Sequence, residues 1–270
     1  MGLKRLQSIK KYIIMNYGAL IIGFEYTKNN DWELLPGITV DLYQIYDYVK
    51  NLNRFKTLVF TDIANDHNTD TLKKAILDGH VDSGLLSFIE DIKVSNCYTI
   101  YQTQVLNQYT VNNFDQTIID FVTGLDRLFL YYTGHGKNGN IILPDGTQVG
   151  MKYIKTLLNT YTNANCQIIS LLDCCESDNK SLVSHPSYQH ISIASTKINE
   201  ETTTCKSGSK FTRSIINKFK NNKILLNCFD NIYISHPNIK YLWNWLILID
   251  HNDITIDIDN TISIITITRH

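Results

Sequence analysis

The sequence has almost no net charge and no broad basic region. Its 25 Lys and Arg residues are balanced by 26 Asp and Glu residues, which gives a formal charge of −1. A nucleic-acid-binding protein needs a basic excess to neutralise phosphates, so we expect no nucleic-acid partner. The small basic cluster within residues 4–11 is typical of a solvated terminal helix.

The chain also lacks an apolar stretch long enough to span a membrane, which takes about 20 residues. Residues 12–23 are apolar but have no small-residue cleavage pattern of the kind that ends a signal peptide. These two absences predict a cytoplasmic protein with no membrane partner.

The six cysteines have neither metal-site nor disulfide-framework spacing. We therefore expect reduced thiols, in agreement with a cytoplasmic location, and no metal ligands. A dithiol redox role for the adjacent Cys174 and Cys175 is disfavoured, because adjacent cysteines form a disulfide only with strain. The chain also has no C-x-x-C motif.

What the sequence does contain is an alternation of apolar strand and amphipathic helix patterns, which predicts an α/β fold. Such alternation is typical of a mostly parallel sheet with helices on both faces. A poorly patterned region at 80–112 is interpreted as an insertion with one weak strand at 98–101. Strands are expected at 17–23, 56–61, 128–133, 168–173 and 191–195, and helices at 40–52, 69–77, 114–125, 151–161 and 210–219.

Two further segments have the pattern of β-hairpins. Residues 140–149 carry Asp145-Gly146 at a predicted turn, and the alternating segments 254–259 and 262–268 meet at Asp259-Asn260. At 270 residues and 43% hydrophobic composition, the chain can bury one main core. We expect an N-terminal extension at 1–16, a main domain at 17–220, and C-terminal strands at 221–270 that complete or decorate that domain.

Two of the predicted strands end in reactive side chains. The strand at 128–133 leads into His135, which lies between two glycines, and the strand at 168–173 leads into Cys174 and Cys175. The carboxyl ends of neighbouring parallel strands lie at one edge of a sheet, so an imidazole and a thiol are expected to meet there. A nearby imidazole favours the thiolate, which is the reactive form of cysteine. These residues therefore predict a dyad of His135 and Cys175.

The motifs Tyr-Tyr-Thr-Gly-His-Gly at 131–136 and Leu-Leu-Asp-Cys-Cys-Glu-Ser at 171–177 resemble those of the caspase-like cysteine peptidases. The resemblance is to the metacaspase and paracaspase branch, and it extends over about residues 17–219. It implies a caspase-like α/β sandwich and an endopeptidase activity with Cys175 as the nucleophile and His135 as the general acid and base. Cys174 falls at a variable position of the family pattern and is expected to be a packing residue. The backbone N–H groups of Gly136 and Cys175 would form the oxyanion hole.

The same resemblance assigns the S1 pocket to Asp41, Thr133 and Asp173. Carboxylates that converge in a partly closed pocket favour Lys or Arg at P1 through charge-assisted hydrogen bonds. True caspases hold an aspartate side chain of the substrate with arginines. This chain has five arginines, and none of them lies beside either motif. We therefore expect peptide or protein substrates with a basic P1 residue. The alternative is that Asp41 is a helix N-terminal charge and Asp173 a strand-end acceptor.

Some features of the sequence leave the function open. Cys-Glu-Ser at 175–177 also resembles the legumain branch of the same clan, which cleaves after Asn, and caspase-like folds also serve as inactive scaffolds or decoys. Both reactive residues are present, which favours an enzyme. Asp145 fits one position of the calcium cluster of metacaspases, but Leu182 occupies another, so we expect no cofactor. Self-cleavage is a further hypothesis for the lysine-containing loop at 196–210, and a monomer is expected.

Overall fold

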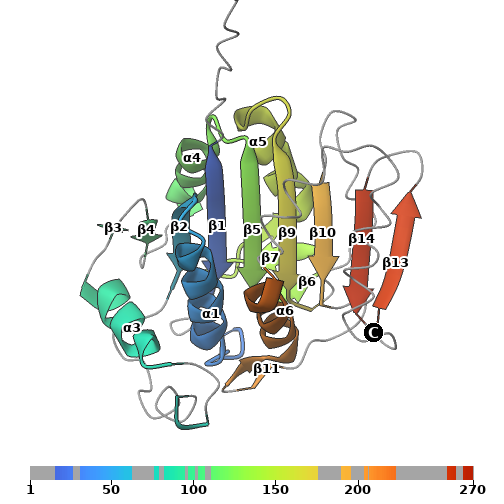
Figure 1. The fold of residues 1–270 in the computed structure, drawn as a ribbon. Coiled ribbons are helices and arrows are strands. Elements are labelled where there is room, and N and C mark those ends of the chain that lie inside the picture. The colour runs from blue at the N-terminus through green and yellow to red at the C-terminus, as the bar shows by residue number, and fades with distance from the viewer. Residues whose placement is uncertain are drawn as a thin grey trace, which may run out of the picture.

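Nine strands form the central sheet of the computed structural model, in the order β13-β14-β10-β9-β5-β1-β2-β4-β3 (Figure 1). The strands are β1 (Tyr17–Gly23), β2 (Phe55–Thr61), β3 (Cys97–Ile100), β4 (Thr103–Leu106), β5 (Arg127–Thr133), β9 (Gln167–Asp173), β10 (His190–Ala194), β13 (Ile254–Asp259) and β14 (Ile264–Arg269). The structure describes residues 16–26, 31–62, 76–78, 82–94, 97–100, 103–106, 111–175, 190–195, 204–205, 207–222, 254–259 and 264–269.

Most of the strand pairs in this sheet are parallel. Only the two edge pairs, β3 with β4 and β13 with β14, are antiparallel. Every residue of β5 and β9 is buried, which is why both strands are apolar along most of their length. The mostly parallel sheet predicted from the sequence pattern is confirmed. The turn expected at Asp259-Asn260 lies partly outside the described residues.

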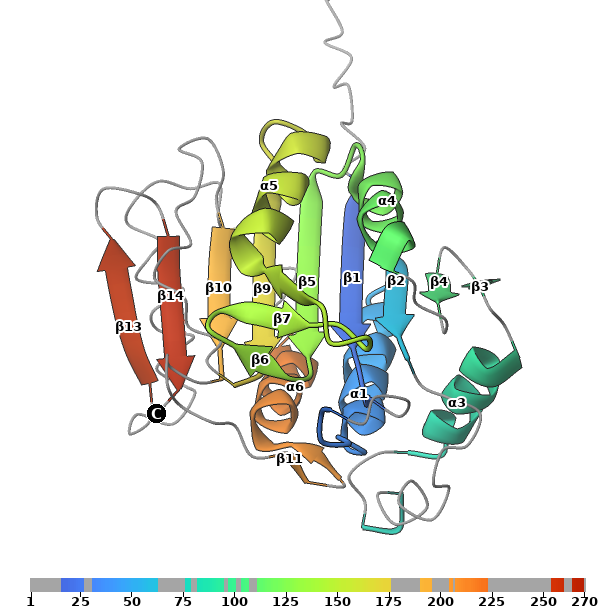
Figure 2. The ribbon, with the colours of Figure 1, turned by 180° about the vertical axis from the view of Figure 1, so that it is seen from behind.

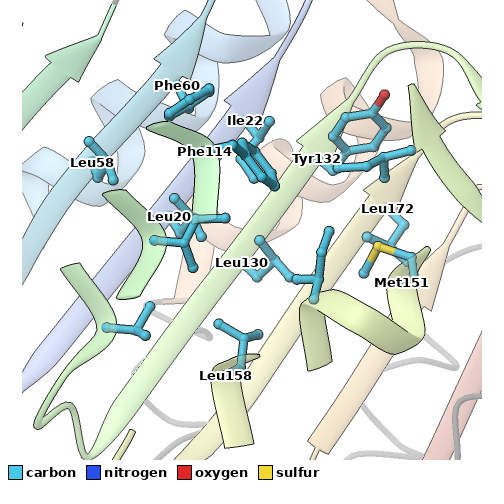
Figure 3. Close-up of a cluster of buried hydrophobic side chains, with 14 of the residues drawn as sticks. Leu20, Ile22, Leu58, Phe60, Phe114, Leu130, Tyr132, Met151, Leu158 and Leu172 are labelled. Atoms are coloured by element: carbon cyan, nitrogen blue, oxygen red, sulfur yellow. The ribbon is translucent and has the colours of Figure 1, made fainter. Parts of the chain in front are cut away.

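Two pairs of helices cover the two faces of the sheet. Helices α1 (Ile38–Asn51) and α6 (Lys210–Asn222) lie on the face seen in Figure 1, and α4 (Val111–Val122) and α5 (Met151–Tyr161) lie on the face seen in Figure 2. Because successive strand residues point to opposite faces, each central strand contributes to two cores. Ala19 and Ile21 of β1 belong to the α1 and α6 core. Leu20 and Ile22 belong to the α4 and α5 core, part of which Figure 3 shows.

A short sheet follows β5 directly in the chain. Its antiparallel strands are β6 (Gly136–Lys137), β7 (Asn140–Ile142) and β8 (Gln148–Gly150). The predicted hairpin is thus present, with Asp145-Gly146 in its turn, and β6 adds a third strand. The Asp145 carboxylate accepts a hydrogen bond from Thr147 N at 2.9 Å, so this candidate calcium ligand stabilises the turn. A second short ladder joins β11 (Thr204–Cys205) to β12 (Gly208–Ser209).

The region 80–112 is more regular than its sequence pattern indicated. It contains α3 (Gly84–Val94), β3 and β4. Leu85, Phe88 and Ile89 of α3 are buried against the α1 core, at the helical spacing that the sequence interpretation missed. The helix predicted at 69–77 lies mostly outside the described residues. None of the helices in the described ranges is long and apolar enough to cross a membrane.

Candidate functional site

The predicted reactive residues follow two neighbouring parallel strands at the same edge of the sheet. In the β5–β9 register, Thr133 lies opposite Asp173, and His135 and Cys175 each come two residues later. The N–H of Gly134 donates to the carbonyl of Asp173 at 3.4 Å, so the two chains stay adjacent beyond the strands. The parallel register therefore brings the two segments to one place, as the sequence predicted.

Gly136 makes the closest approach between these two segments. A Cβ at this position would lie 2.1 Å from the carbonyl oxygen of Cys175 and 2.9 Å from the sulfur of Cys174. Any side chain here would thus push the histidine-bearing turn away from the cysteines. The backbones of the two predicted oxyanion donors, Gly136 and Cys175, are in direct contact.

The His135 imidazole is oriented by a backbone carbonyl. Its Nε2 lies 2.8 Å from the carbonyl oxygen of Glu33. Because a carbonyl oxygen can only accept a hydrogen bond, Nε2 carries the proton in the neutral ring, and Nδ1 keeps the lone pair. The nitrogen that can act as a base is therefore Nδ1.

Two aromatic rings and three phenol or amide groups hold His135 in addition. The ring centroids of Tyr26 and Trp32 lie 4.6 Å and 5.1 Å from that of His135. The His135 N–H donates to Tyr26 Oη at 2.9 Å, and its carbonyl accepts from Tyr132 Oη at 2.7 Å and from Ile142 N at 3.2 Å. Both the ring and the backbone of this residue are thus tied to neighbouring elements.

The two adjacent thiols have different environments. Cys174 is buried in the α4 and α5 core, and this burial raises the pKa of its thiol well above the usual range. Its carbonyl accepts a hydrogen bond from Ser195 Oγ at 3.3 Å. Cys175 is only half-buried. A substrate can therefore approach Cys175 more readily, and Cys174 packs as the sequence interpretation expected.

The three predicted pocket residues lie on the α1 and α6 side of the same strand ends, and all are buried. Asp41 comes from the first turn of α1, and Thr133 and Asp173 are the last residues of β5 and β9. Asp173 Oδ2 accepts a hydrogen bond from Thr212 Oγ1 at 2.7 Å, and that hydroxyl is 2.6 Å from Tyr131 Oη. The result is a buried polar cluster next to the reactive segments.

Two oxygen atoms of this cluster can still accept hydrogen bonds, and burial makes the charge of its carboxylate unfavourable. Thr133 Oγ1 and Asp173 Oδ1 are buried without a hydrogen-bond partner of good geometry among the described residues. Burial raises the pKa of the Asp173 carboxyl above its usual range, although hydroxyl groups around it act in the opposite direction. Burial, and next the charges of Asp41 and Asp173, raise the pKa of Tyr131 well above its usual range. The cluster is acidic and would be stabilised by a cation.

The segment at 207–209 covers Asp41 in this structure. The N–H of Ser209 donates to both oxygens of the Asp41 carboxylate, at 2.9 Å and 3.0 Å. Gly208 has a φ of +91°, and a Cβ there would lie 2.5 Å from Asp41 Oδ1. Ser209 Oγ also accepts from Phe211 N at 3.0 Å, which caps α6. Asp41 and Asp173 both act on the pKa of Tyr131, so the two carboxylates lie in one region. Nothing in the sequence indicated the cover by residues 207–209.

Sequence reasoning did not identify three residues that surround His135. Tyr26 follows β1 at the same sheet edge, which was an available signal for it. Trp32 and Glu33 lie in the connection to α1, and Glu33 acts through its backbone, for which a sequence carries no signal. Among the described residues, no group of three or more His, Cys, Asp or Glu side chains could hold a metal ion.

Comparison with known proteins gives a family match and similar solved structures. The family model described as the caspase domain matches residues 18–232, well over half of the chain. No curated protein matches the sequence significantly. Among solved structures, caspase-1 from Spodoptera frugiperda is similar with a TM-score of 0.45 and 13% sequence identity, over 77% of this chain and 69% of that chain.

Proposed function

The chain belongs to the caspase family of cysteine peptidases, and on this premise we propose that it is a metacaspase-type endopeptidase that cleaves after Lys or Arg. The family match confirms the caspase-like fold and the peptidase class predicted from the sequence. The observation that carries the proposal is the meeting of the two strand ends, where Gly136 lies against the Cys175 carbonyl. The assignment of the individual residues is ours.

In the proposed reaction, His135 Nδ1 accepts the proton of the Cys175 thiol, and the thiolate attacks the substrate carbonyl carbon. The imidazolium then donates its proton to the departing amine, and an acyl-enzyme remains. His135 next removes a proton from water, and the resulting attack releases the acid and the free thiol. The Glu33 carbonyl supports each step, because it holds Nε2–H and keeps Nδ1 as the working nitrogen.

The developing oxyanion requires donors that are already in position. We assign this role to the N–H groups of Gly136 and Cys175. Their contact across the two strand ends supports the assignment, because it places both backbone segments beside the proposed nucleophile.

The acidic cluster supports a preference for a basic P1 side chain. A Lys or Arg side chain could donate to Asp173 Oδ1 and Thr133 Oγ1, which have no hydrogen-bond partner of good geometry in the described part of the chain. Its charge would also compensate the burial of the Asp173 carboxylate. An aspartate at P1 would instead add a third carboxylate to this cluster.

Substrate access to Asp41 requires the segment at 207–209 to move, because Ser209 N–H occupies both carboxylate oxygens. Lys206 directly precedes this segment in the sequence, and Lys210 directly follows it. Cleavage after either lysine would free one end of the cover. Self-processing at 206 or 210 is therefore part of the proposal, with the same basic preference as for other substrates.

Hydrolysis of fluorogenic peptides tests the proposed function directly. Four peptides that differ only in P1, with Arg, Lys, Asn or Asp, would be assayed with and without calcium. We expect turnover after Arg and Lys that Cys175→Ala and His135→Ala abolish and Cys174→Ala largely preserves. Turnover only after Asn would favour legumain-like specificity. No turnover by the folded protein, before or after trypsin treatment of the 206–210 region, would favour an inactive scaffold.

Self-processing needs its own measurement. Intact mass spectrometry of freshly purified wild-type protein, with Cys175→Ala as the reference, would identify fragments that end at Lys206 or Lys210. The double variant Lys206→Gln with Lys210→Gln should remain intact. Fragments that persist in Cys175→Ala would show that another protease makes the cut.

A further inference from the structure

Three residues outside both reactive motifs form one continuous support for the His135 ring. Building on the proposed catalytic role of His135, we propose that Asp62, Tyr26 and Trp32 are positioning residues that together hold its imidazole in the working orientation. Asp62 sets the backbone of a tight turn, Tyr26 carries the contact from that turn to His135, and Trp32 closes a second side of the ring.

Asp62 is the base of this support. It follows β2, and its carboxylate accepts two successive backbone N–H groups after β1, from Glu25 at 2.7 Å and from Tyr26 at 2.8 Å. Tyr26 has a φ of 61°, in the left-handed region that is unfavourable for a residue with a side chain. The two charge-assisted hydrogen bonds offset this cost and keep the turn in place.

The Tyr26 side chain connects this turn to His135. Its phenol is buried, donates to the Ile142 carbonyl at 2.8 Å and accepts from the His135 N–H at 2.9 Å. It also lies 3.2 Å from Tyr132 Oη, and that hydroxyl donates to the His135 carbonyl. A displacement of Tyr26 would therefore move the backbone of His135 as well as the surface on which its ring rests.

Trp32 contacts the ring from a different side. The three ring centroids form a triangle with separations of 4.6 Å for Tyr26–His135, 5.1 Å for Trp32–His135 and 6.4 Å for Tyr26–Trp32. The imidazole thus lies in the corner between two aromatic rings. Trp32 precedes Glu33, so one segment supplies both a ring contact and the carbonyl that binds Nε2.

The physical role of this arrangement is to restrict rotation of the imidazole. Rotation of the ring by half a turn about the Cβ–Cγ bond would exchange Nδ1 with Cδ2 and Cε1 with Nε2. It would therefore break the hydrogen bond from Nε2 to the Glu33 carbonyl. Two aromatic surfaces, a carbonyl acceptor and a fixed backbone leave one orientation for the base. Catalytic groups must be held within about 0.5 Å of the productive geometry, so a loosened ring should slow the reaction more than it weakens substrate binding.

The experiment compares Tyr26→Phe, Tyr26→Leu, Trp32→Phe, Trp32→Leu and Asp62→Asn with the wild type. The readouts are kcat, KM for the Arg peptide, the alkylation rate of Cys175 by iodoacetamide, and Tm. The matched control is Asp82→Asn. Asp82 also accepts a backbone N–H, from Gly84 at 2.8 Å, and a tyrosine hydroxyl, but it lies beside α3 instead of His135.

We expect Tyr26→Leu, Trp32→Leu and Asp62→Asn to lower kcat by roughly 10- to 100-fold with KM changed less than about threefold. Trp32→Phe should recover most of the loss of Trp32→Leu because it restores an aromatic surface. Tyr26→Phe should recover part of the loss of Tyr26→Leu, since it keeps the ring but not the hydrogen bonds of the hydroxyl. Asp82→Asn should leave kcat unchanged. If these residues acted only on folding, the variants would lower Tm but would not show this ranking of kcat values.

The two possible failures can be told apart. If His135→Ala changes neither turnover nor Cys175 alkylation, the proposed function itself is wrong. If His135→Ala abolishes turnover while folded Tyr26→Leu, Trp32→Leu and Asp62→Asn keep wild-type kcat and alkylation rates, the dyad stands and the positioning unit is refuted. A rise in KM at constant kcat would also refute it, because that pattern belongs to a substrate-binding surface.

Discussion

Replacing Gly136 by alanine provides the sharpest test of the geometry of the proposed active site. The alanine Cβ would lie 2.1 Å from the Cys175 carbonyl oxygen, whereas such contacts are essentially never shorter than 3.0 Å. The neighbouring atom belongs to the backbone, so it cannot rotate away as a flexible side chain would. The two strand ends must therefore separate by about 0.9 Å.

This displacement translates into a large loss of activity and a moderate loss of stability. A misplacement of about 1 Å at reacting groups lowers the rate by roughly 100-fold. Overpacking of this kind costs about 1–3 kcal/mol of unfolding free energy. For a chain of this size, each kcal/mol lowers Tm by about 2–4 °C. We expect kcat/KM for the Arg peptide to fall by about 100-fold while the protein remains folded.

A second glycine of the same small sheet provides the matched control. Gly150 is the last residue of β8 in the sheet that begins at Gly136, and its φ of −65° and ψ of 133° are ordinary for any residue. A Cβ there would meet only Asn140 Oδ1, at 3.4 Å. Gly150→Ala should keep kcat/KM within about twofold of the wild type.

The assay is steady-state hydrolysis, combined with thermal unfolding of each variant. Equal kcat/KM values for Gly136→Ala and the wild type would refute the reasoning, because they would mean that the contact with the Cys175 carbonyl does not set the spacing of the reacting groups. A similar loss of activity in Gly150→Ala and Gly136→Ala would also refute it. That outcome would point to the small sheet as a whole.

Three further predictions concern ionisation, thiol chemistry and packing. Burial raises the pKa of Asp62 to about 6 from 3.8, although a hydrogen bond from the Glu25 N–H lowers it. Between about pH 4 and 6, Asp62 therefore keeps a proton in the folded state that it has lost in the unfolded chain. The free energy of unfolding of the wild type, relative to that of Asp62→Asn, should fall as pH rises through this range, as urea titrations would show. Iodoacetamide at neutral pH should alkylate Cys175 and spare Cys174, as peptide mass spectrometry would show, and equal labelling would contradict the difference in burial. Leu130→Ala, in a fully packed strand, should cost about 2–5 kcal/mol by denaturant unfolding, and a value below 1 kcal/mol would contradict the packing.

The central layer of the fold could be predicted from sequence pattern alone. Strands β5 and β9 each span seven residues, are apolar along most of their length, and are buried along their whole length. Such runs, separated by amphipathic helices, permit few arrangements other than a covered parallel sheet. Strand β4 was missed because it has only four residues, and α3 was missed although its apolar residues have helical spacing.

The meeting of the two segments that carry His135 and Cys175 could also be predicted, and their catalytic roles stay a proposal. His135 and Cys175 follow strands whose apolar pattern is strong, and parallel neighbours end at one edge. The acidic set of Asp41 and Asp173 could be recognised by its resemblance to a known pattern. Its burial could not.

What the sequence determined by itself is therefore the class of fold and the peptidase class, together with the proposal that His135 and Cys175 react. The tertiary structure decided the parts that depend on backbone groups and on contacts between distant segments. The Glu33 carbonyl that selects the His135 tautomer has no side-chain signature, and it lies 102 residues from the ring that it orients. Ser209 covers Asp41 through a backbone N–H across 168 residues. Backbone groups are the same in every residue, so only the folded chain specifies which of them meet.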